Sequence, residues 1–143
     1  MSWNFNFLDH TADIAFEIEA DSLDELFIAS AAAFKKAVIE DYFSEEKEEK
    51  TIRKSESSLE ELLVTFLDEL NFLLETRKWI ISEINKIKIS ELNKEFYLVA
   101  EISGEPVNID KHHLKEEIKA VTFHQMEVKK VNNKFRTNVV FDI

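Results

Sequence analysis

Two helical segments that begin with the same serine-led pattern constrain the fold of this 143-residue chain most strongly. Ser22 and Ser58 are each followed three residues later by a glutamate, and this spacing is a capping box that starts a helix. Apolar residues then recur at helical spacing to about Asp41 in the first segment and to about Glu75 in the second. We therefore predict two long amphipathic helices.

Most of the remaining chain alternates apolar and polar residues, which indicates strands. The alternating or extended segments are residues 3–8, 14–20, 51–57, 84–89 (with an irregularity), 96–102, 118–128 and 135–143. Asn93-Lys94 and Asn132-Asn133 predict hairpin turns, and Ser103-Gly104-Glu105-Pro106 predicts a sharp turn that ends a strand. The expected fold class is α+β, with two long helices packed on a mostly antiparallel or mixed sheet of about seven strands, in a single domain over residues 1–143.

Charge and composition exclude several kinds of function. The formal net charge is −11 and the basic residues are mostly interspersed with glutamate, so we expect no direct nucleic-acid binding. Cysteine is absent, which excludes a thiol nucleophile or a thiolate metal site. The chain has no apolar run of membrane length and no signal sequence, so we expect no membrane span and a cytoplasmic location. A single glycine and no P-loop argue against catalysis on a nucleotide, and the oligomeric state stays open.

Carboxylates lie near both ends of the chain. Asp13 stands between the first two predicted strands, and Asp142 directly precedes the terminal residue Ile143. If the fold brings Asp13 to the chain end, three anionic groups converge, and such a cluster needs a cation such as Ca²⁺. Taken singly, the same residues have plainer interpretations: a turn residue or helix cap, a solvated charge and a frayed end.

Three further residues are candidates for supporting this site. His10 is interpreted as a histidine that hydrogen-bonds its own loop, with a zinc ligand or general base as the alternative. Lys119 is a candidate counter-charge or a plain surface lysine, and Asp41 is a candidate acidic contributor or a helix-end residue. His112 and its neighbour His113 lie in a polar segment, and we predict that both are exposed.

Short stretches of the chain resemble the archease family and occur in the family's order along nearly the whole length. They are Phe7–Ile14, Ser22–Phe27, Glu61–Leu70, Gly104–Pro106, Ile118–His124 and Val140–Ile143. None of these stretches is specific alone, and the ordered set carries the resemblance.

The resemblance implies a function that no periodicity shows. Archeases are small activators of the GTP-dependent RtcB-type RNA ligase, which joins tRNA halves and repairs RNA ends. They speed formation of the ligase–guanylate intermediate, permit multiple turnover and bind a divalent metal, typically Ca²⁺. The matching metal residues here are Asp13, Asp142 and Ile143, so the resemblance predicts a non-catalytic activator whose partner is such a ligase. The alternatives are a metal-dependent phosphoester hydrolase that uses Asp13, His10 and Asp142, and a general chaperone or adaptor.

Overall fold

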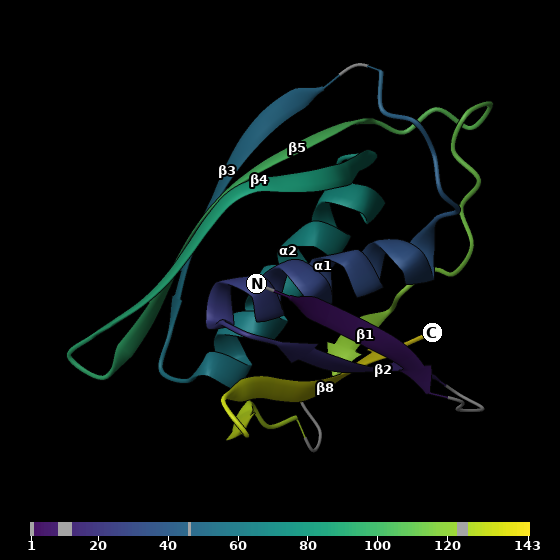
Figure 1. The fold of residues 1–143 in the computed structure, drawn as a ribbon. Helices are drawn as coiled ribbons and strands as arrows, with labels where there is room; N and C mark the ends of the chain where they lie inside the picture. Colours follow the sequence, from purple (N-terminus) through teal and green to yellow (C-terminus); the bar gives the residue numbers. More distant parts are fainter. Residues whose placement is uncertain (1, 9–12, 46, 123–125) are drawn as a thin grey trace.

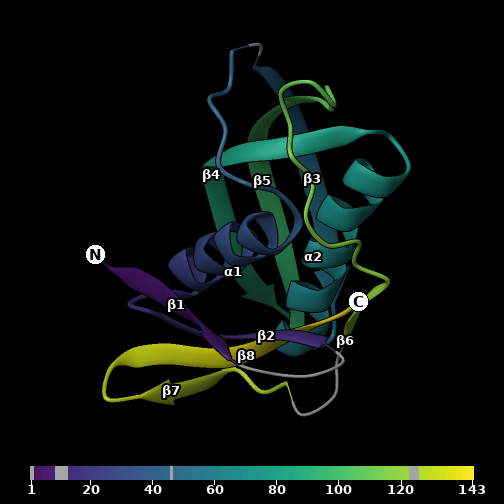
Figure 2. The same cartoon turned by 90° about the vertical axis from the view of Figure 1, so that its right-hand side faces the viewer.

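Two β-sheets enclose a layer formed by two helices (Figures 1 and 2). The structure is a computed structural model that describes residues 2–8, 13–45, 47–122 and 126–143. Its elements in chain order are β1 (Trp3–Leu8), β2 (Asp13–Ala20), α1 (Leu23–Val38), β3 (Glu48–Glu56), α2 (Leu59–Glu75), β4 (Trp79–Leu92), β5 (Glu95–Pro106), β6 (Ala120–Thr122), β7 (Lys129–Val131) and β8 (Lys134–Asp142). The predicted α+β class is confirmed, and the eight strands of the described residues are divided between two sheets.

The larger sheet has the strand order β1-β2-β8-β6, with β7 also paired to β8, and the smaller sheet has the order β3-β5-β4. Every described pairing is antiparallel. The last long strand, β8, therefore lies in the middle of the larger sheet, between β2 and β6. This central position brings the end of the chain beside the start of β2.

Both helices begin where their capping serines predict. The hydroxyl oxygen of Ser22 accepts a hydrogen bond from the Glu25 backbone N–H at 3.2 Å, and that of Ser58 accepts one from the Glu61 N–H at 3.1 Å. Helix α2 ends at Glu75 as predicted, but α1 ends at Val38 rather than near Asp41. The reason is tertiary, because Ile39 forms an isolated β-bridge with Leu114 and leaves the helical path.

Phenylalanines join the helical layer to the larger sheet. Phe27 of α1 packs against Phe66 of α2 with ring centroids 6.0 Å apart, and Phe34 of α1 packs against Phe141 of β8 at the same separation. All four side chains are fully buried. Burial of each contributes roughly 1.5–3 kcal/mol relative to exposure. Phe141 thus anchors the end of β8, directly before the candidate ligand Asp142.

The predicted hairpin turns are confirmed. Asn93 and Lys94 have φ angles of 52° and 64°, and Asn132 and Asn133 have 52° and 66°. Two successive left-handed residues form the type I′ turn that suits a two-residue hairpin. The irregularity predicted in residues 84–89 is also confirmed, because the register of β4 shifts between Ile84 and Lys86.

The prediction that Ser103–Pro106 turns sharply is wrong. These residues continue β5 to its end, and Gly104 pairs with Glu48 of β3 on one side and with Ile81 of β4 on the other. The glycine is required by packing rather than by a turn, because a Cβ at Gly104 would meet the carbonyl oxygen of Ile80 and the ring of Trp79.

The prediction of one strand over residues 118–128 is also wrong in part. Only β6 lies in this range, and residues 123–125 lie outside the described part of the chain. The Asn71 side-chain amide donates to the Ile118 carbonyl at 2.9 Å, and the Glu60 carboxylate accepts from the Val128 N–H at 2.8 Å. Side chains of α2 therefore satisfy backbone groups that a longer strand would have paired.

Within the described ranges, no helix has the length and the apolar content that crossing a membrane would require.

Candidate functional site

The structure brings Asp13 and Asp142 together as direct partners in the sheet. Asp13 is the first residue of β2 and Asp142 the last of β8, and the two are paired in the antiparallel register. Side chains of directly opposite residues share one face of the sheet, with Cβ atoms about 4.5–5.5 Å apart. Figure 2 shows the end of the chain next to the start of β2. Two carboxylates from opposite ends of the sequence therefore lie side by side.

A third strand completes the surroundings of Asp142. Ala120 of β6 pairs with Asp142 on the side opposite to Asp13, and the backbone N–H of Lys119 donates to the Asp142 carbonyl at 2.8 Å. Helix α2 holds this part of β6, because Val121 donates a backbone hydrogen bond to Asp68. Partial burial raises the pKa of Asp68, and the hydrogen bond from Val121 opposes that rise.

A cavity of about 460 Å³ adjoins the paired aspartates. Asp13 and Ile143 both line it, so these two residues lie near each other. Lys36 of α1, Lys115 and Glu116 line the same cavity, so charges of both signs surround Asp13. Apolar contributions come from Phe5, Phe7, Ile14, Phe16 and Ala37.

This arrangement suits a hard cation in the chemistry of its donors. Carboxylate oxygens are the ligands that Ca²⁺ and Mg²⁺ prefer, whereas zinc prefers nitrogen and sulfur. Two like charges directly opposite in a sheet repel each other, and a bound cation would remove that repulsion. Among the described residues, no group of three or more His, Cys, Asp or Glu side chains could hold a metal ion. The described side chains of these types therefore offer no third donor beside the two aspartates.

The supporting residues predicted from sequence differ in where they lie. His10 lies outside the described residues. Lys119 reaches Asp142 through its backbone N–H, and its side chain is exposed. Asp41 follows the end of α1 and lines a different cavity, of about 480 Å³, with Lys35 and Lys36. Asp13 and Ile143 line the cavity of about 460 Å³.

The prediction that His112 is exposed is wrong, since the residue has a relative accessibility of only 3%. Its Nε2 lies 3.0 Å from a carboxylate oxygen of buried Glu105, and its Nδ1 accepts a hydrogen bond from the Asn108 backbone N–H at 2.8 Å. Because Nδ1 accepts, Nε2 carries the proton and donates to Glu105. Lys111 also pairs with Glu105 at 3.0 Å. Glu105 is seven residues before His112, and no pattern in the sequence links the two residues, so the burial of His112 could not be predicted.

The buried histidine fastens the segment that leads to the candidate site. Beyond His112, the His113 carbonyl accepts from the Glu40 N–H at 3.0 Å, and the Lys115 N–H donates to the Val38 carbonyl at 2.7 Å. Figure 2 shows this segment running from the end of β5, past the helices, to β6. The network therefore fixes the route by which Lys115 and Lys119 reach the surroundings of Asp142.

Tyr42 closes the network and provides a pH-dependent signal. Its ring packs edge-on against His112 with centroids 4.6 Å apart, and its hydroxyl donates to the Ile81 carbonyl at 3.0 Å. Burial, and then the nearby Glu105 carboxylate, raise the pKa of Tyr42 to about 12. A folded-state pKa above the unfolded value means that the neutral phenol stabilises the fold. This contribution is complete below about pH 10 and is lost as the pH rises toward 12.

We expect an absorbance titration at 295 nm to contain a tyrosinate step near pH 12 that is missing in Tyr42→Phe. We also expect the Tyr42→Phe variant to be less stable by about 1 kcal/mol at neutral pH, because the hydrogen bond to Ile81 is lost. Identical titrations of the variant and the parent chain would contradict the assignment.

Comparisons with known proteins find relatives that match along most of the chain. The sequence profile of the archease protein family matches residues 5–143. Protein archease from Pyrococcus abyssi is 33% identical over 136 residues, covering 94% of this chain and 95% of that protein. Protein archease from Methanosarcina barkeri is 32% identical over 139 residues, covering 97% of this chain and 95% of that protein.

Two solved structures have the same architecture. The solution structure of a Methanobacterium thermoautotrophicum protein superposes with a TM-score of 0.84 at 31% identity, covering 97% of this chain and 98% of that one. The crystal structure of an archease from Thermotoga maritima, described as a possible chaperone, gives 0.57 at 23% identity and covers 95% and 94% of the two chains. The second likeness, at this identity, concerns the fold alone.

Fold and site together define a small two-sheet α+β protein with paired acidic residues beside the end of its last strand. The chain belongs to the archease family.

Proposed function

We propose that this chain activates a GTP-dependent RtcB-type RNA ligase and is not itself an enzyme. In this proposal it promotes guanylylation of the ligase and multiple turnover during tRNA splicing and RNA repair. The observation that carries the proposal is the register pairing of Asp13 with Asp142, because it juxtaposes the two acidic side chains that family resemblance assigns to a metal.

We propose further that Asp13, Asp142 and the terminal carboxylate of Ile143 hold a divalent cation of the Ca²⁺ type. The donor set supports this assignment because all the donors are hard oxygens and no cysteine is present. A cation bound there would neutralise the opposed carboxylates and leave coordination positions open to a partner's oxygen. Lys36 and Lys115 line the cavity together with Asp13 and Ile143, and they offset part of the local negative charge.

In this mechanism the residues of the chain hold the two carboxylates in place, and the guanylylation reaction itself takes place on the ligase. β2 and β8 hold the two carboxylates in register, and the segment fastened by His112 brings β6 against Asp142. We place this end of the larger sheet at the contact with the ligase. There it would orient a carboxylate, or share its cation, so that the ligase histidine accepts guanylate more readily.

The test is a ligase guanylylation assay with radiolabelled GTP, with and without this chain, over a calcium titration. We expect faster guanylylation and repeated turnover only when both the chain and calcium are present. Equal rates with and without the chain would overturn the proposal. Turnover of phosphoester substrates without ligase would favour the hydrolase alternative, and equal protection of unrelated aggregating proteins would favour a general chaperone.

A C-terminal tag is expected to weaken calcium binding. Extending the chain beyond Ile143 converts the terminal carboxylate into an amide and removes one anionic donor, and the number of charged ligands sets the affinity of calcium sites. Titration calorimetry should therefore give at least about tenfold weaker binding for a C-terminally tagged protein than for one tagged at the N-terminus. Equal affinities of the two proteins would remove Ile143 from the ligand set.

A further inference from the structure

Strand β1 forms an open edge of the larger sheet. Within the part of the chain that is described, β1 pairs with β2 alone and no strand pairs with its outer side. Its six residues pair with β2 without a register shift and include no charge and no proline. Protected edge strands usually carry lysine, proline or a bulge. In a chain of which 33% is charged, this uncharged edge is open to pairing with another strand.

The hydrogen-bond pattern shows which backbone groups of β1 are available. The Asp21 N–H donates to the Ser2 carbonyl at 3.0 Å, so these two residues form a hydrogen-bonded pair just before the strand. Hydrogen-bonded and non-hydrogen-bonded pairs alternate along an antiparallel ladder. Asn4 and Asn6 therefore bond to β2, while the backbone N–H and C=O groups of residues 3, 5 and 7 point to the open edge.

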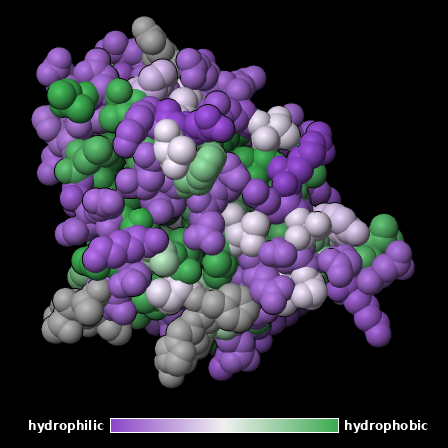
Figure 3. All heavy atoms as spheres, turned by 180° about the vertical axis from the view of Figure 1, so that it is seen from behind, coloured by the Kyte–Doolittle hydropathy of each residue, from purple (hydrophilic) through white to green (hydrophobic). Residues whose placement is uncertain are grey.

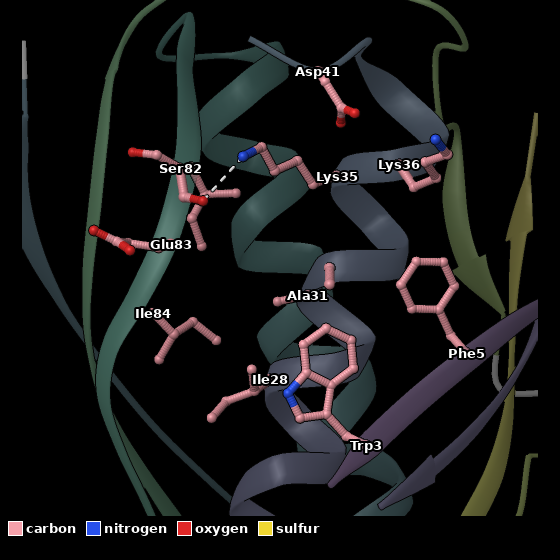
Figure 4. Close-up of a pocket in the computed structure, with 12 residues that line it drawn as sticks. Trp3, Phe5, Ile28, Ala31, Lys35, Lys36, Asp41, Ser82, Glu83 and Ile84 are labelled. Atoms are coloured by element: carbon pink, nitrogen blue, oxygen red, sulfur yellow. Dashed lines mark hydrogen bonds between the residues drawn. The ribbon is translucent and has the colours of Figure 1, made fainter. Parts of the chain in front are cut away.

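Two cavities follow this edge. The first, of about 480 Å³, lies between Trp3 and Phe5 of β1 and Ile84 of β4, with Ala31 and Ala32 of α1 among its lining residues (Figure 4). The second is the cavity of about 460 Å³ next to Asp13, which Phe5 and Phe7 line.

The two cavities adjoin successive residues on one face of β1. Phe5 lines both of them, so one cavity lies at residues 3 and 5 and the other at residues 5 and 7. Alternate residues of a strand face the same side and are about 6.8 Å apart. A strand added to β1 would thus present side chains i and i+2 to the two cavities. Strand β4 lies across the first cavity from β1 and is less suited to pairing with an added strand. Register shifts interrupt β4 at Ile81/Glu83 and Ile84/Lys86.

Charge indicates the chemistry of the added strand. Charges of both signs line the two cavities, and Lys36 is the charged residue that the two linings share. Lys36 is exposed, and among the described residues its ammonium group has no hydrogen-bond or ion-pair partner. A carboxylate on the incoming strand would pair with it. A second copy of this chain fits poorly, because its own β1 has no acidic residue and each copy has a net charge of −11.

On the face seen in Figure 3, hydrophobic residues form small groups among hydrophilic ones.

We propose that β1 is a docking edge for an extended segment of another protein. The segment adds to the larger sheet as a strand, places two alternating apolar side chains in the two cavities and pairs a carboxylate with Lys36. Backbone hydrogen bonds supply affinity in this mode of recognition and the cavities supply specificity.

The test selects binders from a phage-displayed library of random nine-residue peptides, with EDTA and without ligase, so that it does not depend on the calcium site. We expect enriched peptides to carry apolar residues at i and i+2 and an acidic residue nearby. In hydrogen exchange followed by NMR, the best peptide should protect the amides of Trp3, Phe5 and Phe7. The amides of Asn4 and Asn6, already bonded to β2, should keep their protection.

Matched variants check the cavities and the charge. Ala32→Leu, which reduces the first cavity, and Lys36→Glu should each weaken binding of the enriched peptide at least about tenfold. Lys88→Glu, an equal charge change on β4, should leave the affinity unchanged. No enrichment, enriched peptides without alternation, unprotected amides at residues 3, 5 and 7, or concentration-dependent self-association through β1 would each overturn the proposal.

Discussion

Replacing either Asp13 or Asp142 with asparagine is expected to abolish calcium-dependent activation of the ligase while leaving the fold intact. The two residues are register partners at the ends of β2 and β8, so each substitution removes one of two adjacent carboxylates. Calcium at one hundred times its dissociation constant should stabilise the parent protein by about 2.7 kcal/mol, and this increment should be absent from both variants. Thermal unfolding with and without calcium measures it directly.

Without calcium, we expect the stabilities of the parent and the two variants to compare differently. Like charges directly opposite in a sheet destabilise it by up to about 1 kcal/mol, so both asparagine variants should be at least as stable as the parent without metal. Glu17→Gln is the matched control. It removes a carboxylate from β2, the strand that also carries Asp13, but the Glu17 carboxylate lies 3.4 Å from Arg136 and not opposite another acid. This control should keep both calcium binding and activation. A variant of Asp13 or Asp142 that activates at the full rate would eliminate the proposed site.

Replacing Gly104 is expected to destabilise the chain more than any other single change considered above. An added Cβ would lie 2.5 and 2.6 Å from ring carbons of Trp79 and closer still to the Ile80 carbonyl oxygen. The ring is held in place, because its Nε1 donates to Glu48 at 3.0 Å and the Lys50 ammonium lies 5.1 Å from its centroid. We expect Gly104→Ala to cost about 4 kcal/mol and Gly104→Val to prevent folding.

Urea denaturation of Gly104→Ala, with Ser103→Ala as the neighbouring control, measures this effect. The control loses the 2.6 Å hydrogen bond between the Asn85 amide and the Ser103 hydroxyl, so it should cost only about 1 kcal/mol. Adding Trp79→Leu to Gly104→Ala should restore part of the stability, because it removes the ring contact but not the Ile80 carbonyl. If both alanine variants unfold at the same urea concentration, the close packing around Gly104 does not limit stability.

The features that sequence predicted correctly depend on near neighbours in the chain. Ser22 and Ser58 start their helices through a hydrogen bond from a residue three positions later, and the Asn93-Lys94 turn is formed by the two residues themselves. The features that sequence missed depend on distant residues. His112 is buried by Glu105 and Tyr42, and residues 118–119 leave the expected strand because α2 and β8 bind their backbone groups.

The candidate site combines both kinds of information. Sequence identified Asp13, Asp142 and Ile143 as oxygen donors near the two chain ends, and their role as metal ligands remains a prediction. Whether Asp13 lies opposite Asp142 depends on β8 entering the sheet between β2 and β6. The neighbouring cavity depends in turn on α1, which contributes Lys36, and on the segment after β5, which contributes Lys115.

The amino-acid sequence by itself determined the two capped helices, most strands, the hairpin turns and the chemistry of the candidate donors. Each of these follows from the period of the apolar residues or from interactions over a few positions. Only the tertiary structure decided that the strands form two sheets, that Asp13 and Asp142 are neighbours, that His112 is buried and that β1 keeps an open edge. These features arise from contacts between segments far apart in the chain, and packing of the shared apolar core selects which segments meet.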